Sequence, residues 1–269
     1  MSGSDRVAPN GIEAHSWGSA PDFVGPRHAY RESLMVRHLE PILTGRRVLN
    51  AGAGGGSLSM TLLERGLDVT SVDGSPEFVD YLRGAIASRF PRLDPSPVVE
   101  VGDLHALQFA DRSFDAVVCG EVLEHLEDDA TAATELARVL RPGGVLVASV
   151  PANPRRFDWV DRWAGHQRRY TAQGLEQLLL RAGFTDVRVT PWGFPLTGLY
   201  HRWVYRPMLA RRLAQGGGAD VAIGASGGGL THKALRAVFE IDTLFLGKFP
   251  GWFGLLAQAR KPPDRTNDA

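Results

Sequence analysis

The chain has 269 residues, of which 43% are hydrophobic and 22% are charged, and this balance excludes disorder as its default state. Its 30 Lys and Arg residues equal its 30 Asp and Glu residues, which argues against a general polyanion binder while leaving room for local basic patches, and no nucleic-acid partner is expected. One cysteine, Cys119, excludes an intrachain disulfide, and the first residues lack a signal-peptide pattern, so a cytoplasmic protein is expected. No apolar run reaches the roughly 20 residues of a transmembrane helix, and composition leaves the oligomeric state undetermined.

The predicted elements alternate between helices and strands after a flexible N-terminal arm at residues 1–26. Apolar residues at helical spacing, capping residues and buried-type apolar runs locate these elements. Helices are predicted over 28–43, 57–66, 75–90, 128–140 and 171–183, and strands over 46–51, 67–73, 97–103, 114–120, 145–150, 184–192 and 251–261. This alternation predicts an α/β fold with a doubly wound, mostly parallel seven-stranded sheet and helices on both faces.

The stretch 191–250 differs from the core predicted over 27–190, and we expect a helical cap insertion before the last strand. Its first half is basic and aromatic, its middle at 215–229 is a glycine-rich linker, and an apolar helix follows. The aromatic residues of its first half are Trp192, Phe194, Tyr200, Trp203 and Tyr205. We expect their side chains either to line a pocket for an acceptor substrate or to pack the cap against the sheet. Four arginines also allow a membrane-surface helix, although Pro207 argues against it. Residues 262–269 are expected to be a tail.

A glycine-rich turn follows the first predicted strand. Gly52, Gly54 and Gly56 remove side chains where the backbone must turn sharply or approach a ligand. Asp73 ends the second strand, where a carboxylate can accept both ribose hydroxyls of a nucleoside. A nicotinamide dinucleotide and S-adenosylmethionine both fit this pattern, but the position of the third dinucleotide glycine holds Ser57.

Motifs further along the chain favour the second cofactor. The run from Val48 to Ser149 holds the glycine loop, Asp73, "GD" at 102–103, "FDAVV", "LEHL" and "LRPGG" in order. Together these resemble the core of a class I S-adenosylmethionine-dependent methyltransferase, and "GHQRRYT" and "LLLRAGF" extend the resemblance to about Val189. The resemblance implies a Rossmann-like methyltransferase fold and S-adenosylmethionine as cofactor.

The resemblance also implies roles for individual residues. The three glycines would line the methionine part of the cofactor, Asp73 would hold the ribose diol, and Asp103 would accept from the adenine amino group. The full predicted cofactor set is Asn50, Gly52, Ala53, Gly54, Asp73, Gly74, Asp103, Leu104, Gly120 and Glu121. The last two of these would border the sulfonium and the methyl acceptor.

Asn50 departs from the family pattern, which has an acid at this position. The usual acid organises the loop and the amino group of methionine, whereas Asn offers an acceptor of similar shape without charge. Hydrogen bonds to charged groups contribute roughly 1.5–3 kcal/mol and neutral ones about half, so weaker cofactor binding is expected, without loss of the site.

Methyl transfer requires positioning of two reactants and removal of one proton. His125 and His166 are the predicted catalytic residues, because imidazole is suited to proton transfer near neutral pH. An alternative is a divalent ion held by Glu121, Glu124, His125 and His166, since the first three have i, i+3, i+4 spacing on one helical face. The metal is possible but not favoured.

These observations predict O-methylation of a small metabolite, such as a natural-product or lipid-linked intermediate. The alternative is a protein of the same fold that binds the cofactor for chemistry other than methyl transfer, such as cyclisation. A dinucleotide oxidoreductase is the remaining alternative.

Overall fold

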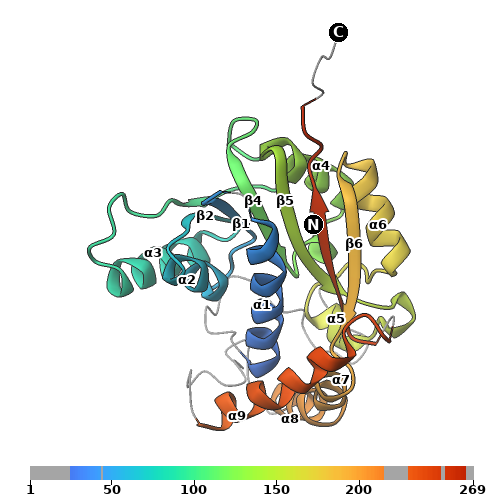
Figure 1. Cartoon of the computed structure of the whole chain (residues 1–269). Helices are drawn as coiled ribbons and strands as arrows, with labels where there is room; N and C mark the ends of the chain where they lie inside the picture. Colours follow the sequence, from blue (N-terminus) through green and yellow to red (C-terminus); the bar gives the residue numbers. More distant parts are fainter. Residues whose placement is uncertain (1–24, 44, 215–229, 250–251, 265–269) are drawn as a thin grey trace, which may run out of the picture.

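A seven-stranded sheet forms the centre of the molecule (Figure 1). The computed structural model describes residues 25–43, 45–214, 230–249 and 252–264. The strands are β1 (Arg47–Ala51), β2 (Asp68–Asp73), β3 (Val99–Val101), β4 (Phe114–Gly120), β5 (Leu140–Pro151), β6 (Thr185–Trp192) and β7 (Gly254–Arg260). Their order is β3-β2-β1-β4-β5-β7-β6. Strand β7 runs in the opposite direction to the other strands and pairs antiparallel with both β5 and β6. The predicted fold class, a mostly parallel doubly wound sheet, is confirmed.

Helices cover both faces of this sheet (Figure 1). They are α1 (Pro26–Leu39), α2 (Ser57–Glu64), α3 (Pro76–Arg89), α4 (Asp129–Val139), α5 (Trp159–Trp163), α6 (Ala172–Arg181), α7 (Leu196–Tyr200), α8 (Arg206–Ala214) and α9 (Leu230–Phe239). Alternate strand residues point to opposite faces, so Val48 packs with α1, α2 and α3, while its neighbour Leu49 packs with α4 and α6.

Local sequence signals position several helices as expected. The hydroxyl of Ser75 accepts from the amide of Phe78 at 3.2 Å, and Pro76 follows as the first residue of α3. Thr171 caps α6 in the same way, through a 2.9 Å bond from the Gly174 amide. These caps satisfy amides that the first helical turn leaves without partners.

Three predicted boundaries are wrong. The fifth strand begins at Leu140 instead of 145, because Leu140 already pairs with Phe114 and a register shift between Phe114 and Ala116 absorbs the Pro-Gly-Gly segment. The third strand is shorter than expected, at Val99–Val101. The segment after β4 forms a 3₁₀ turn at Leu123–His125 rather than the start of a helix, and α4 begins only at Asp129.

The predicted C-terminal insertion is helical and lies at the lower end of the sheet in Figure 1. Between β6 and β7 it contains α7, a π-helical turn at His201–Tyr205, α8, α9 and a 3₁₀ segment at Glu240–Phe245. Pro207 lies near the start of α8, which continues directly from the π-helical turn at His201–Tyr205. Most of the expected arm at 1–26 and the linker at 215–229 lie outside the described residues. In the described part, no helix has the length and apolar character needed to cross a membrane.

Candidate cofactor and acceptor site

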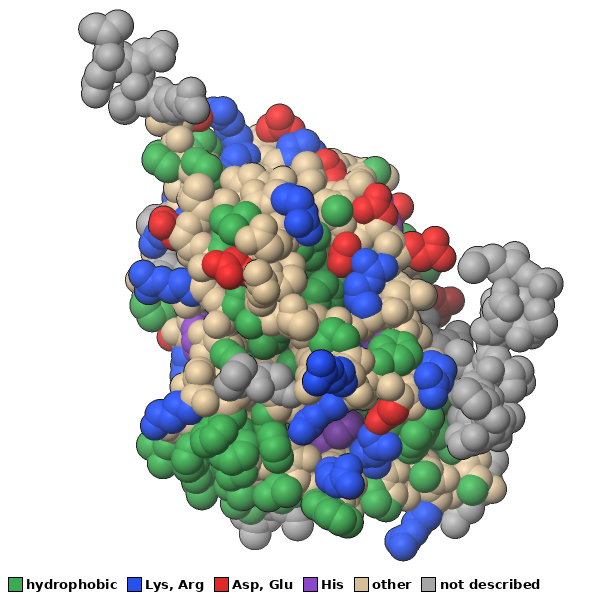
Figure 2. Space-filling view, turned by 90° about the vertical axis from the view of Figure 1, so that its right-hand side faces the viewer, with side chains coloured by type: hydrophobic (Ala, Val, Ile, Leu, Met, Phe, Trp, Pro, Cys, Tyr) green, Lys and Arg blue, Asp and Glu red, His purple; other side chains and the backbone are tan. Residues whose placement is uncertain are grey.

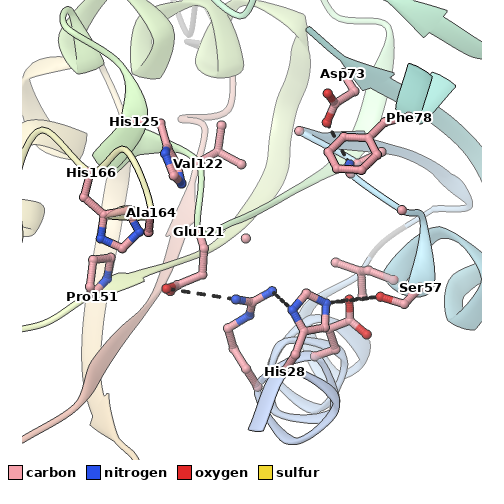
Figure 3. Close-up of a pocket in the computed structure, with 18 of the residues that line it drawn as sticks. His28, Ser57, Asp73, Phe78, Glu121, Val122, His125, Pro151, Ala164 and His166 are labelled. Carbon is pink, nitrogen blue, oxygen red and sulfur yellow. Dashed lines mark hydrogen bonds and ion pairs between the residues drawn. The ribbon is translucent and has the colours of Figure 1, made fainter. Parts of the chain in front are cut away.

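One cavity of about 790 Å³ lies at the carboxyl ends of the parallel strands, where open α/β sheets bind their ligands. It is lined by α1, by the loops that follow β1 to β5, and by parts of the insertion. Every predicted cofactor residue lines this cavity, as do His125 and His166 (Figure 3). The structure therefore brings together residues that span more than a hundred positions in the sequence.

The glycine loop after β1 has the conformation that its sequence requires. Gly52 and Gly54 have φ angles of 75° and 51°, which favour glycine. A Cβ on Gly52 would lie 2.3 Å from Val122 Cγ2, whereas a Cβ on Gly54 would meet nothing within 4 Å. The amides of Gly52 and Ala53 both donate to the Val72 carbonyl, at 2.8 and 2.9 Å. The loop is thus fixed to β2 on one side and exposes backbone to the cavity on the other.

Asp73 anchors the same loop from the end of β2. One carboxylate oxygen accepts from the Gly54 amide at 2.7 Å and the other from the Ser75 amide at 2.9 Å (Figure 3). Each oxygen has a second lone pair, so the carboxylate can accept further bonds from a diol in the cavity. Asp73 also holds the turn that begins α3, because its bond from the Ser75 amide lies directly before that helix.

Asp103 and Leu104 lie after β3, at the rim of the cavity. The carboxylate of Asp103 accepts from the amide of His105 at 2.9 Å, and the His105 ring lies 2.7 Å from the same oxygen. The bond from the His105 amide is the main cause that lowers the pKa of Asp103. The Asp103 side chain remains 65% exposed, so it keeps acceptor capacity, while Leu104 is buried beside it.

Asn50 is almost fully buried and belongs to a polar cluster behind the loop. Its side-chain amide donates to Ser59 Oγ at 2.8 Å, and the hydroxyls of Ser59 and Ser71 lie 2.8 Å apart. A carboxylate at this position could not donate that hydrogen bond. The structure thus gives a local reason for Asn instead of the family's acid.

Helix α1 brings a carboxylate to the glycine loop, which sequence analysis did not anticipate. Glu32 Oε1 accepts from Ser57 Oγ at 2.6 Å and lies 2.9 Å from His28 Nε2, and all three residues line the cavity (Figure 3). Burial favours a higher pKa for Glu32, but His28, Arg31 and Ser57 outweigh it and lower the pKa. The cavity therefore holds an ionised carboxylate beside Ser57, the first residue after the glycine loop.

Glu121 follows β4 with a φ angle of 59°, a left-handed conformation that is unusual for a residue with a side chain. Its Oε1 accepts from Ser149 Oγ at 3.2 Å, and its Oε2 lies 4.0 Å from Arg31 Nη1 (Figure 3). The prediction that Glu121, Glu124 and His125 share one helical face is wrong, because the chain forms a strained turn and a 3₁₀ turn there.

His166 is held by a buried carboxylate. Its Nδ1 lies 2.9 Å from Asp161 Oδ1, and the same oxygen accepts from Arg169 Nε at 2.7 Å. Burial favours a higher pKa for Asp161, but the bonds from His166 and Arg169 lower it. An ionised carboxylate only accepts, so Nδ1 of His166 carries the hydrogen and Nε2 is left as an acceptor. The His125 ring packs edge-on against this ring, with centroids 4.8 Å apart.

Glu124 lies behind the two histidines and is fully buried. Neither of its carboxylate oxygens has a hydrogen-bond partner among the described residues, and Oε1 lies 4.0 Å from His166 Nε2. Burial, and then the charge of Glu121, raise its pKa well above the ordinary value. Ligand atoms of Glu124, His125 and His166 lie within 4.8 Å of one another, a grouping that could hold a metal ion.

The aromatic residues expected to line an acceptor pocket divide into two groups. Trp192 and Tyr205 line the cavity. Phe194 instead packs with Phe249 at 3.9 Å between ring centroids, and Trp203 is 67% exposed. The cap therefore contributes part of its aromatic surface to the cavity and uses the rest for its own packing or leaves it at the surface.

Comparison with known proteins identifies the family. Residues 49–148 match the family model described as a methyltransferase domain. An uncharacterized methyltransferase of Mycobacterium tuberculosis is 40% identical over 147 residues, which are 54% of this chain and 56% of that protein. A ubiquinone biosynthesis O-methyltransferase of Xanthomonas axonopodis is 38% identical over 139 residues, or 51% and 56% of the two chains. Residues 49–148 therefore form a class I S-adenosylmethionine-dependent methyltransferase domain.

The chain spans just over half the length of these curated relatives. Its fold resembles a solved [4+2]-cyclase, SpnF, with a TM-score of 0.60 and 22% identity, over 96% of this chain and 88% of that one. The cofactor of the family is S-adenosylmethionine, and the cavity fits it. Positive-φ glycines expose backbone beside the Asp73 carboxylate, and a second carboxylate, Glu32, lies close to the same loop.

Proposed function

We propose that this methyltransferase transfers a methyl group from S-adenosylmethionine to a hydroxyl group of a small metabolite, such as a natural-product or lipid-linked intermediate. The observation that carries the proposal is the Asp161–His166 pair, which lines the same cavity as the glycine loop. A hydroxyl acceptor must lose a proton to form a neutral ether, and an oriented imidazole with an accepting Nε2 supplies the base.

S-Adenosylmethionine, when bound, supplies an electrophilic methyl group on a sulfonium centre. Asp73 would accept from the ribose hydroxyls, and Asp103, with the Leu104 amide, would accept and donate at the adenine edge. The loop at Gly52–Gly54 would line the methionine part. Glu32 would accept from its ammonium group and so supply the charge that Asn50 does not. Support for the last role comes from the position of Glu32, which bonds to Ser57 at the end of that loop.

His166 would take the acceptor's proton at Nε2, while Asp161 fixes the ring through Nδ1 and stabilises the imidazolium that forms. The oxygen of the acceptor gains the methyl group, and its O–H proton goes to His166. General-base assistance of this kind is worth about a hundred- to ten-thousandfold in rate. His125, whose ring packs against His166, would form the adjacent wall.

A divalent ion is the alternative means of activating the hydroxyl. Glu124, His125 and His166 are close enough together to hold one, but the predicted fourth ligand, Glu121, is turned towards Ser149 and Arg31. A chelator would abolish transfer if a metal is used, and a divalent ion would restore it. We favour the metal-free arrangement, in which the chelator has no effect.

The test of the function uses S-adenosylmethionine with a labelled methyl group and cell extract as the source of acceptor. Formation of S-adenosylhomocysteine together with a labelled, alkali-stable product is expected, and His166→Ala should abolish most of both. If the protein binds S-adenosylmethionine and produces no S-adenosylhomocysteine, the alternative of non-methylating chemistry such as cyclisation stands instead. The similarity in fold to the [4+2]-cyclase makes that outcome a defined competitor.

We further propose a cytoplasmic enzyme whose acceptor is a small molecule rather than a nucleic acid. The balanced charge of the chain and the cavity of about 790 Å³ support a small-molecule acceptor.

A further inference from the structure

Cationic side chains gather on the part of the cavity formed by the first turn of α1 and by the insertion. Arg27, from α1, lies against His201 and Tyr205 of the π-helical turn and against Phe253, which precedes β7. All four residues line the cavity. Figure 2 shows Lys and Arg side chains around a histidine on the lower part of one face, at the height of the insertion.

His201 is held in its neutral form at this place. Its pKa is lowered well below the ordinary value, first by burial and then by the charges of Arg27, Arg169, Arg206 and Arg156. A neutral ring can accept, and Arg27 Nη1 lies 2.5 Å from His201 Nδ1. Four guanidinium groups therefore contribute to lowering the pKa of the one His201 imidazole, so positive charge is concentrated around this ring.

Only part of this charge is neutralised by the protein. Arg169 pairs with Asp161, and Arg206 pairs with Asp158. Among the described residues, no carboxylate pairs with Arg27, whose guanidinium instead lies 4.5 Å from the ring centroid of Tyr205 and 5.3 Å from that of Phe253. The cavity thus contains a cation that is half-buried, held in place by rings and still able to bind an anion with its remaining N–H groups.

The backbone adds to this charge. Arg27 lies in the first turn of α1, which contains no acidic residue, and the preceding Gly25 offers no side chain to cap the helix. The positive end of the helix dipole therefore points into the same region. Arg169 connects this region to the proposed base, because the carboxylate that it contacts also holds His166.

We propose that Arg27, with His201 and Arg169 beside it, forms a subsite for an oxyanion carried by the methyl acceptor, and that the apolar body of the acceptor lies against Tyr205 and Phe253. This inference rests on the proposed function, because it assigns a chemical class to the acceptor of that reaction. The acceptor is a hydroxylated compound with a phosphate or carboxylate group. Guanidinium binds both through paired N–H donors.

The subsite can be tested by anion binding, without turnover. Protein saturated with S-adenosylhomocysteine is titrated calorimetrically with inorganic phosphate and, separately, with benzoate. We expect saturable binding of at least one anion to the wild type and a loss of about ten- to a hundredfold in Arg27→Met. Arg27→Lys, which keeps the charge without the planar fork, should fall between them. Arg155→Met is the matched control, because Arg155 is exposed and lies outside the cavity.

The two anions distinguish the possible acceptors. Binding of phosphate alone assigns a phosphorylated acceptor, and preferential binding of benzoate assigns an aromatic carboxylate. The proposal is overturned if neither anion binds the wild type saturably, or if Arg27→Met binds as the wild type does. It is also overturned if Arg27→Met weakens S-adenosylhomocysteine by the same factor as the anion, because Arg27 would then serve the cofactor.

Failure of the proposed function has a different signature. Arg27-dependent anion binding without formation of S-adenosylhomocysteine from cell extract would refute methyl transfer and leave the subsite intact. Methyl transfer with equal rates in Arg27→Met and Arg155→Met would support the function and refute the subsite.

Discussion

Replacing Glu32 by Gln tests whether helix α1 supplies the charge that the glycine loop lacks. Gln keeps the shape of the side chain and can still accept from Ser57 or His28, so the fold should be retained. What is lost is a negative charge on a side chain that is only 10% exposed. Hydrogen bonds to charged groups are worth roughly 1.5–3 kcal/mol and neutral ones about half. We therefore expect about tenfold weaker binding of S-adenosylmethionine.

The decisive form of this experiment is a double-mutant cycle with Asn50→Asp. In the wild-type background the added acid can no longer donate to Ser59, although the Ser59 hydroxyl can donate to it, and Glu32 already supplies a negative charge at the loop. The affinity should therefore change little. In the Glu32→Gln background the same substitution should restore about tenfold in affinity, because it replaces the missing charge. Glu40→Gln is the matched control, since Glu40 lies just after α1 and its exposed ion pair with Arg65 is remote from the loop.

Calorimetry with S-adenosylmethionine at low salt, alongside thermal unfolding, measures both effects. Wild-type affinity in Glu32→Gln with a lowered melting temperature would make Glu32 a structural residue and refute the role in binding. Equal tightening by Asn50→Asp in both backgrounds would refute the coupling. The pKa of Glu32 is below its ordinary value of 4.5. Its contribution to folding is therefore complete above that pH and is lost as the pH falls through the folded-state value.

Three further outcomes are expected. Asp73→Ala should weaken S-adenosylmethionine binding by roughly 2–4 kcal/mol in calorimetry, because the ribose diol and the Gly54 amide lose a charged acceptor. Unchanged affinity would refute the role of Asp73 in cofactor binding. His166→Ala and Asp161→Asn should both lower the rate of methyl transfer with cofactor affinity kept, because the base or the carboxylate that orients it is lost. The wild-type rate should increase with pH and His166→Ala should lose this increase, whereas full turnover in both variants would refute the base. The pKa of Glu124 is raised in the folded state, so its contribution to stability is complete at pH values below its unfolded-state pKa and is lost as the pH rises through its folded-state pKa. Glu124→Gln should therefore gain stability relative to the wild type as the pH rises. Melting temperatures that change with pH in parallel for the two proteins would contradict this.

Local signals in the sequence were sufficient to predict the elements that gather around the cavity. The glycine loop, Asp73 and the "GD" at the end of β3 each follow a strand of a parallel sheet, and such strand ends meet at one edge. Their gathering around one cavity therefore follows from the order of the elements alone. The roles of these residues stay predictions, because the positions that they occupy do not by themselves report a bound cofactor.

Helix packing was not predictable in the same way. The predicted N-terminal helix is confirmed as α1, but nothing in its local pattern places it over a loop that begins some 25 residues later. One signal was present. Glu32 lies three residues before Met35 and seven before Leu39, so it shares the apolar stripe of the helix with two buried side chains. An acid on a buried stripe needs a partner, and that partner is at the glycine loop.

The segment after β4 shows a second limit. Spacing of i, i+3 and i+4 places residues on one face only if the chain is an α-helix. Here the left-handed Glu121 and the 3₁₀ turn at Leu123–His125 intervene, and the Glu121 carboxylate contacts Ser149 and Arg31. A functional site is a place where such departures from regular geometry are expected.

The position of β7 has a consequence for the order in which the enzyme assembles. Strand β6 reaches the sheet only through β7, which lies between it and β5, and Trp192 at the end of β6 pairs with Gly254 at the start of β7. During synthesis the glycine-loop half of the sheet can form once β5 has emerged, whereas β6, with Trp192 at its end, can join the sheet only after residues 254–260 leave the ribosome. The part of the sheet that bears the glycine loop is therefore expected to form before the edge that carries the insertion. A nascent chain stalled just before β7 should already bind S-adenosylmethionine, and it should gain the ability to recognise its acceptor only with the last strand.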